Sequence, residues 1–315
     1  MSSRGIPNLA MSVHQRLMNR IRREQLDPTR TFTLYALERL LFRLSQSRHA
    51  NRFVLKGAML FSVWEIHVLR PTRDLDFLGL GDFSSEALRR MLHDICGTAV
   101  EPDGMVYDVD SMIIEDIRAE DDYVGRRVLM TSHLGNARIP IQIDIGVGDA
   151  VEIPFRQERF PTLLDSPAPE VLAYTRETMI AEKFQAMVNL GIRNSRMKDF
   201  FDIWTLARQC PFDGETLQRA IKATFHRRNT QLSSIPPLAL TAEFSEAPGK
   251  QAQWAAFLRR IGVNQDESLA RIVGDIADFL CPVTTAIAEN QPFNRHWPQG
   301  GPWQNRKTRA MPGHR

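Results

Sequence analysis

Asp74 and Asp76 give the first indication of chemistry in this chain. They lie two residues apart in the stretch RPTRDLDF at 70–77, where acidic and apolar residues alternate. Side chains two residues apart point to the same face of a strand, so the two carboxylates would lie side by side. Hard oxygen ligands at such a site suit Mg²⁺ or Mn²⁺, which keep other coordination positions for water and phosphate. The alternative is a solvated strand edge.

A third carboxylate, Asp144, lies inside the apolar run from Ile139 to Val147. An acid in a buried strand is costly unless it is paired or bound to a metal. If this strand neighbours the one with Asp74 and Asp76, three carboxylates converge, as a two-metal phosphoryl-transfer site requires. The alternative is that Asp144 faces solvent on a one-sided sheet.

A glycine turn precedes the first two acids. Lys56, Gly57 and Ala58 follow the apolar run at 53–55 and precede a helix expected at 58–66. A glycine lets the backbone approach a ligand closely, and a helix N-terminus presents free N–H groups to phosphate. Strand–glycine–helix turns also occur without any ligand, so this feature alone does not indicate a site.

Charged residues gather on two helices expected farther along the chain. Lys183 lies at the margin of an apolar helix face, where it can contact a triphosphate or extend its head group to solvent. On the next helix, with Ser195 as its N-cap, Asp199 and Asp202 share a face, and Lys198 is spaced to pair with Asp202. The alternative is a salt-bridged helix surface.

In this order, the segments resemble the AbiEii/AbiGii toxin family, nucleotidyltransferases of the DNA polymerase β superfamily that include MenT-like tRNA-modifying toxins. The resemblance runs from about residue 52 to 203, and its most specific part is the segment NSRMKDFFD at 194–202. Two departures are visible. Ala58 stands where the superfamily usually has serine or glycine, and the segment between Ala58 and Asp74 is long.

The resemblance implies a role for each matching residue. The residues implied for metal binding are Asp74, Asp76 and Asp144. Those implied for catalysis are these three acids together with Lys183, Asp199 and Asp202. Those implied for nucleotide binding are Lys56, Gly57, Ala58, Thr72, Lys183, Arg196 and Lys198.

Hydrophobic periodicity predicts the elements that carry these residues. Helices are expected at 12–24, 33–47, 58–66, 84–95, 177–190, 195–209, 213–226, 250–262 and 266–280. Strands are expected at 53–55 and 74–78, and a hairpin at 125–133 and 137–147 around Gly135-Asn136. The fold class is therefore α+β, with a nucleotidyltransferase-like mixed sheet and helices in the N-terminal half and an all-helical C-terminal half. Prolines at 161–169 mark a linker, which predicts domains at 1–155 and 156–290 and a basic, disordered tail at 291–315.

The composition excludes several classes of protein. The 315 residues contain 43% hydrophobic and 24% charged residues, enough apolar material for a core. No apolar run reaches the roughly 18 residues of a membrane span, and no secretory signal is expected at the N-terminus. Three distant cysteines predict reduced thiols and neither a disulfide framework nor a CxxC metal site, so we expect a cytoplasmic protein.

The formal charge of +3 is concentrated at the two ends of the chain. Residues 1–30 carry six arginines against Glu24 and Asp27, and residues 291–315 carry five basic residues and no acid. Arg16, Arg20 and Arg23 would form one stripe on a helix. Basic ends favour a polyanionic partner, although a basic disordered tail also occurs in proteins that bind no nucleic acid.

We therefore expect an NTP-dependent, Mg²⁺-dependent nucleotidyltransferase that moves an NMP to an acceptor hydroxyl. By the resemblance, the acceptor is RNA, at the 3′ end of tRNA, and the protein is the toxin of a bacterial toxin–antitoxin pair with a cognate antitoxin. The alternatives are nucleotidylation of a protein or small molecule, a non-catalytic nucleic-acid-binding protein, and a nuclease, which would give the glycine turn no role.

Overall fold

The computed structural model describes residues 5–66, 72, 74–118, 124–147, 155–262 and 267–306. Its contacts divide these residues into two units, a first ending at Tyr174 and a second beginning at Thr175. Each unit is considered by itself. No helix in the described ranges is long and apolar enough to cross a membrane.

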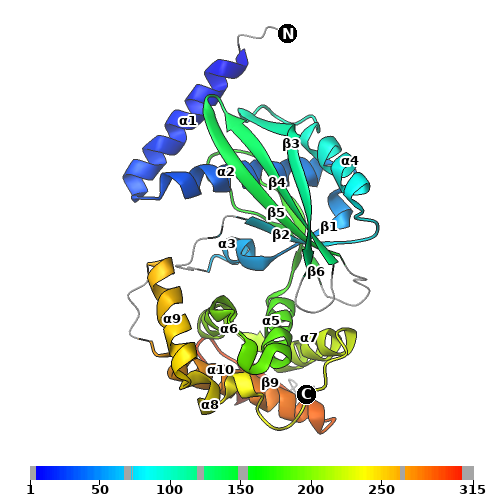
Figure 1. The fold of residues 1–315 in the computed structure, drawn as a ribbon, viewed down its shortest axis with the longest axis vertical. Helices are drawn as coiled ribbons and strands as arrows, with labels where there is room; N and C mark the ends of the chain where they lie inside the picture. The colour runs from blue at the N-terminus through cyan, green and yellow to red at the C-terminus, as the bar shows by residue number, and fades with distance from the viewer. Residues whose placement is uncertain are drawn as a thin grey trace, which may run out of the picture. The chain divides into compact units, whose positions relative to one another are not determined.

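A seven-stranded mixed sheet forms the centre of the first unit, with the strand order β3-β4-β5-β2-β1-β7-β6 (Figure 1). Its strands are β1 (Phe53–Lys56), β2 (Asp74–Gly79), β3 (Met105–Arg118), β4 (Val124–Leu134), β5 (Ala137–Val147), β6 (Phe155–Arg159) and β7 (Glu170–Tyr174). Its helices are α1 (Gly5–Glu24), α2 (Pro28–Gln46), α3 (Leu60–Val63) and α4 (Ser85–Cys96).

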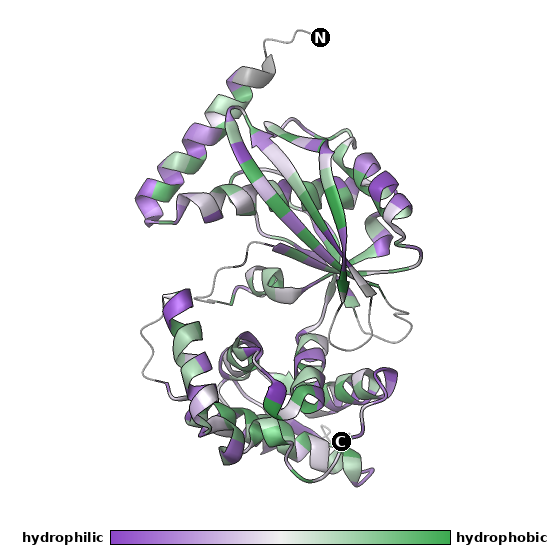
Figure 2. Ribbon diagram, in the orientation of Figure 1, coloured by the Kyte–Doolittle hydropathy of each residue, from purple (hydrophilic) through white to green (hydrophobic). Residues whose placement is uncertain are grey.

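Helices α2 and α4 pack on one face of this sheet and bury its apolar side chains. Leu75 and Ile143 from the strands lie in one apolar cluster with Leu41 of α2 and Leu92 of α4. Along β4 and β5 apolar and polar residues alternate (Figure 2), so the apolar set faces the helices and the polar set faces away. The acids of β2 and β5 belong to the polar set.

The second unit consists of helices and a small sheet. Its helices are α5 (Arg176–Leu190), α6 (Met197–Gln209), α7 (Gly214–Arg227), α8 (Ala242–Ser245), α9 (Pro248–Ile261) and α10 (Leu269–Ala288). Its three short strands are β8 (Phe212–Asp213), β9 (Arg295–Trp297) and β10 (Gln304–Asn305), in the order β10-β9-β8. The α+β class is confirmed, with these three strands added to the helical half.

The hairpin around Gly135-Asn136 is confirmed as β4 and β5, and most predicted helices differ from the observed ones by a few residues at their ends. The helix expected at 58–66 is wrong in length. The chain forms a 3₁₀ turn at Gly57–Met59 and then only the four residues of α3. The Ser195 cap is also displaced, because α6 begins at Met197 and Arg196 occupies the cap position.

The strands β3, β6 and β7 were not predicted. A register shift between Asp108 and Ile113 interrupts the alternation of β3. β6 is a mostly exposed edge strand, so its residues carry no apolar pattern, and it pairs with β7 across the proline-containing segment. The division between the units therefore falls after Tyr174, later than the boundary at 155 that the sequence predicts.

The predicted disorder of the basic tail is wrong for its described part, up to residue 306. Trp303 stacks on Phe279 of α10 at 5.6 Å, and the Trp297 indole donates a hydrogen bond to the Ala207 carbonyl at 2.7 Å. Aromatic burial outweighs the polar and proline-rich composition on which the prediction was based. Lys307, Arg309 and Arg315 lie outside the described residues.

Candidate functional site

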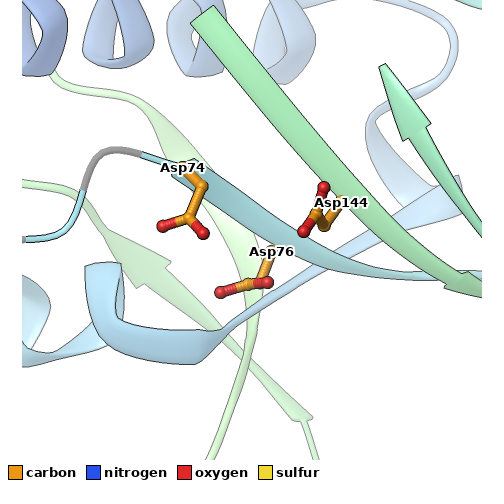
Figure 3. A group of neighbouring side chains, drawn as sticks. All are labelled: Asp74, Asp76 and Asp144. Atoms are coloured by element: carbon orange, nitrogen blue, oxygen red, sulfur yellow. The ribbon is translucent and has the colours of Figure 1, made fainter. Parts of the chain in front are cut away.

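Asp74, Asp76 and Asp144 come together on the polar face of the sheet. One carboxylate oxygen from each lies within 4.8 Å of the others, and all three residues are half-buried. Figure 3 shows Asp74 and Asp76 projecting from β2 and Asp144 from β5 beside it. Three oxygen ligands at this spacing form a donor set of the kind that holds a hard divalent cation.

Strand register brings the three acids together. β2 and β5 are parallel neighbours in which Asp76 is the partner of Asp144, and β1 is antiparallel to β2 with Lys56 as the partner of Asp76. Asp74 points the same way as Asp76 because it lies two residues earlier on the strand. Its Oδ1 accepts a hydrogen bond from the Thr72 hydroxyl at 2.9 Å. Thr72 therefore orients a carboxylate, whereas the resemblance implies a nucleotide contact.

The glycine turn lies directly against the acidic group. Gly57 has a φ of +71°, a conformation that residues with a Cβ rarely adopt, and a Cβ there would overlap the Asp76 carboxylate. Glycine is therefore required at this position for two independent reasons. α3 has only four residues, so the phosphate-binding helix N-terminus expected after the glycine turn does not form. Ala58 is half-buried in the 3₁₀ turn.

Lys56 also lies at this face. Its Nζ approaches Gly146, two residues beyond Asp144 on β5, to 3.1 Å from the position that a Cβ on that glycine would take. A glycine at 146 leaves room for the lysine side chain. The ammonium is thus held beside the strand that carries the third acid. Arg70 and Arg73, which belong to the same sequence motif, lie outside the described residues.

Arg127 on β4 is a member of this group that sequence analysis missed. It is the strand partner of Asp144, to which its Nε and Nη2 donate hydrogen bonds of 2.9 and 2.7 Å. Hydrogen bonding to Asp144 raises the pKa of the Arg127 guanidinium. The alternation of β4 and the hairpin register could have indicated this pair, because the turn at Gly135-Asn136 places residues 127 and 144 opposite each other.

Lys183, Asp199 and Asp202 form a separate group inside the second unit. The Lys183 Nζ on α5 lies 2.5 Å from an oxygen of Asp199 and 2.9 Å from an oxygen of Asp202, both on α6. The two aspartate side chains are at most 1% exposed and the lysine side chain is 13% exposed. The salt-bridged helix surface considered above is therefore wrong for these three residues, because their ion pairs are buried.

The Asp199 carboxylate is ionised despite its burial. Desolvation opposes the charged form, but the charges of Lys183 and Arg196 outweigh it and lower the pKa of Asp199. Arg196 is exposed and its Nε lies 2.9 Å from Asp199. Lys198 is also exposed, and the structure pairs Asp202 with Lys183, not with Lys198 as the spacing predicted.

A family model matches most of the chain. A family model described as nucleotidyl transferase AbiEii toxin, type IV toxin–antitoxin system, matches residues 39–279. Among curated proteins, none matches. The chain is similar to a crystal structure of a candidate nucleotidyltransferase from H. pylori, at 14% identity and a TM-score of 0.48, over 84% of this chain and 98% of that one. It is similar to JHP933 from Helicobacter pylori at 14% identity and a TM-score of 0.47, over 84% and 95% of the two chains.

Proposed function

The chain belongs to the AbiEii family of nucleotidyltransferase toxins, and from this premise we propose that it uses a divalent cation to transfer the NMP of an NTP to the 3′ end of tRNA. One observation carries the proposal. The acids Asp74, Asp76 and Asp144 converge on a face of the sheet beside a glycine turn that no other residue could form without displacing Asp76.

The residues present fit a hard cation such as Mg²⁺ or Mn²⁺. The donors are carboxylate oxygens only, and a hydroxyl from Thr72 fixes the orientation of Asp74. Asp74, Asp76 and Asp144 would hold the ion. When bound, the ion would polarise the α-phosphate and lower the pKa of the acceptor hydroxyl.

The chain itself would orient the nucleotide. Lys56 carries a cation to the same face as the acids, where it can bind phosphate oxygens of the NTP. Gly57 and Ala58 form a turn that lets the backbone approach the phosphates closely. These contacts would hold the triphosphate while the acceptor oxygen attacks the α-phosphorus, and pyrophosphate leaves.

The group in the second unit has a proposed role of its own. Lys183 would bind a phosphate of the nucleotide, with its ammonium held in place by the carboxylates of Asp199 and Asp202. Arg196 and Lys198 would add exposed positive charge for the nucleotide. Lys183 is paired with two buried carboxylates, so its ammonium is held in a more defined position than that of an exposed lysine. This fixed position supports the proposed role.

The family also suggests partners. A toxin of this family implies an NTP substrate and a cognate antitoxin, and we propose a cytoplasmic location, where NTPs and tRNA occur. The exposed arginines of α1 support an RNA acceptor, because contacts between basic side chains and phosphates contribute much of the affinity of a protein for nucleic acid.

A transfer assay tests this function. The protein is incubated with each labelled NTP, total tRNA and Mg²⁺, with and without EDTA. Label on tRNA that depends on metal is the expected result. Label on the protein itself or on a small molecule would show that the acceptor is not tRNA, while the nucleotidyl transfer reaction would be the same. RNA binding with no transfer of label from any NTP would establish the non-catalytic alternative.

A further inference from the structure

Lys250 is a buried lysine that the proposed site does not use. It is 7% exposed and lies in the first turn of α9, outside the segment that carries the family resemblance. Its Nζ donates a hydrogen bond of 2.8 Å to the Asn194 carbonyl and one of 3.4 Å to the side-chain oxygen of Gln253. The same ammonium lies 5.1 Å from the centre of the Phe244 ring. All of these partners are uncharged, so none of them neutralises the lysine.

The position of this lysine is unfavourable for α9 itself. Within the described residues no carboxylate forms an ion pair with it, and burial lowers the pKa of Lys250. The first turn of a helix also disfavours positive charge, because the N–H groups there form the positive end of the helix dipole. An apolar side chain of similar size would cost the helix less. The lysine is therefore better explained by the group that its ammonium holds.

That group is the connection between α5 and α6. Within this connection the Asn194 side chain is buried, and its Oδ1 accepts a hydrogen bond of 2.8 Å from the backbone N–H of Arg196. Lys250 binds the carbonyl of the same asparagine, so Asn194 is held at both its backbone and its side chain. The backbone at Arg196 is therefore tied to α9 through one residue.

Arg196 links this connection to the charged group proposed to bind the nucleotide. Its Nε lies 2.9 Å from one oxygen of Asp199, and the other oxygen of Asp199 lies 2.5 Å from the Lys183 Nζ. Arg196 is exposed, so its guanidinium can contact a phosphate as well as Asp199. A shift of the backbone at Asn194 would move this guanidinium away from its place beside Asp199.

We propose that Lys250 is a positioning residue for NTP binding and acts on Arg196 through the Asn194 carbonyl. The inference rests on the proposed function and deepens it. Lys250 does not touch the nucleotide itself. It holds the connection in the conformation that presents Arg196 beside Lys183, so less of the chain has to be ordered when the NTP binds.

NTP affinity tests this role. The full chain is titrated with each NTP and Mg²⁺ by calorimetry, and KM and kcat are measured by transfer of label. Lys250→Met fills a similar volume without the donor and should weaken NTP binding about tenfold, as expected when a charged contact with a phosphate is lost. KM for the NTP should rise while kcat changes little, because the lysine affects binding and not the reacting atoms. Lys250→Arg keeps a donor and should recover most of the affinity.

Two further variants separate this role from a loss of stability. Asn194→Ala removes the oxygen that accepts the Arg196 N–H and should weaken NTP binding in the same way. Combined with Lys250→Met it should have little further effect, because both changes act on one series of contacts. Trp254→Phe, on the same helix, loses a hydrogen bond to the Glu267 carbonyl and should lower the melting temperature without changing NTP affinity.

Wild-type NTP affinity in a folded Lys250→Met chain would overturn the inference. Wild-type affinity in Asn194→Ala would overturn it even if Lys250→Met does not fold. An equal loss of affinity in Trp254→Phe would also overturn it, because any loss of stability would then weaken binding.

The proposed function is judged separately, by label on tRNA. If the wild type labels tRNA and KM is unchanged in Lys250→Met, only the role of Lys250 is refuted. If the variants bind NTP more weakly but the wild type transfers no label, only the proposed function is refuted. A wild type that binds no NTP contradicts both.

Discussion

Asp76 lies at the centre of the acidic group formed by Asp74, Asp76 and Asp144. It is the strand partner of Lys56 on one side and of Asp144 on the other, and Gly57 lies against its carboxylate. Because it lies at the centre of the group, loss of its charge should affect the proposed metal site more than loss of any other single acid in the sheet.

Asp76→Asn should lower NMP transfer at least about a hundredfold, roughly 2.7 kcal/mol of transition-state stabilisation. The melting temperature without metal should stay the same or rise slightly, because like charges are removed from one place. Asp110→Asn, which changes an exposed acid on β3, is the matched control and should transfer normally. Near-normal transfer by Asp76→Asn would show that this carboxylate holds no ion.

Gly57→Ala should impair the same site without removing any charge. The added Cβ meets the Asp76 carboxylate and forces a strained φ, so Asp76 must move. We expect weaker Mn²⁺ binding and slower transfer, measured by titration and by label. Gly274→Ala adds the same methyl group in α10 with no atom within 4 Å, and should stabilise the fold by up to about 1 kcal/mol and leave Mn²⁺ binding unchanged. Equal Mn²⁺ affinity in both variants would refute the steric argument.

At the scale of elements, the buried lysine joins helices α5 and α6. Lys183→Met leaves the carboxylates of Asp199 and Asp202 buried with less positive charge, which should destabilise the second unit by about 3–5 kcal/mol. Unfolding in guanidinium chloride, followed by tryptophan fluorescence, measures this, because four of the five tryptophans belong to that unit. Lys222→Met on the exposed face of α7 should change little.

The proposed nucleotide contact of Lys183 makes a second, separable prediction. Lys183→Arg keeps the positive charge between the carboxylates and should recover most of the stability, but should bind NTP more weakly than the wild type because a guanidinium is not an equivalent point charge. Calorimetric titration with NTP and Mg²⁺ measures the affinity. Wild-type affinity in Lys183→Arg and in a folded Lys183→Met would assign the lysine to structure alone.

Helix α2 carries a buried acid that makes the stability of the first unit depend on pH. Burial raises the pKa of Glu38 from 4.5 to about 7, although Arg39 beside it opposes the shift. Its carboxylate accepts a hydrogen bond from the Leu163 backbone N–H at 2.6 Å and so fixes the segment between β6 and β7 to α2. The folded pKa lies above the unfolded one, so the contribution of Glu38 to stability is complete below pH 4.5 and is lost as pH rises through about 7.

Glu38→Gln should remove this pH dependence. Between pH 5 and 8.5 the unfolding free energy of the wild type should fall relative to that of the variant by up to about 3 kcal/mol. The variant also leaves Arg39 without its carboxylate, a constant cost that shifts the curve but not its slope. Urea unfolding by far-UV circular dichroism gives both curves, and Glu170→Gln at an exposed position is the control. Parallel curves for the wild type and Glu38→Gln would contradict the raised pKa.

At the scale of the whole molecule, the basic ends differ from what their composition suggested. On α1, Arg16 is exposed, whereas Arg20 pairs with Glu24 and donates a hydrogen bond to the Leu163 carbonyl. The stripe of arginines therefore serves partly to join α1 to the first unit. The C-terminal segment packs its aromatic residues on α10, so deletion from residue 291 would expose Phe279 and destabilise the second unit. Deletion of residues 307–315 alone removes tail charge without this effect.

Replacement of Arg16, Arg20 and Arg23 by glutamine should weaken RNA binding and flatten its salt dependence. Each lost phosphate contact should lower the log–log slope by roughly 0.7 to 0.9, because fewer counterions are released. Filter binding across a salt series measures the slope, and NTP affinity should stay unchanged. Deletion of residues 307–315, which removes Lys307, Arg309 and Arg315, should have little effect. Unchanged binding by the triple variant would assign acceptor recognition to the helical unit.

The sequence by itself determined the local parts of this protein. Alternation fixes which side of β2 and β5 is polar, and hence that Asp74 and Asp76 point the same way as each other. Periodicity, capping residues and glycines determine most helices, because these signals act over a few residues. The order of motifs along the chain was enough to indicate the family, which the family model confirms.

Only the tertiary structure decided which of these parts meet. The position of Asp144 beside Asp76, the bidentate contact of Arg127 and the burial of Lys183 between two acids all depend on strand register or helix packing between segments distant in sequence. The same is true of the aromatic residues that order the C-terminal segment. Such contacts arise from burial and geometry summed over the whole fold, whereas composition and spacing carry only local preferences.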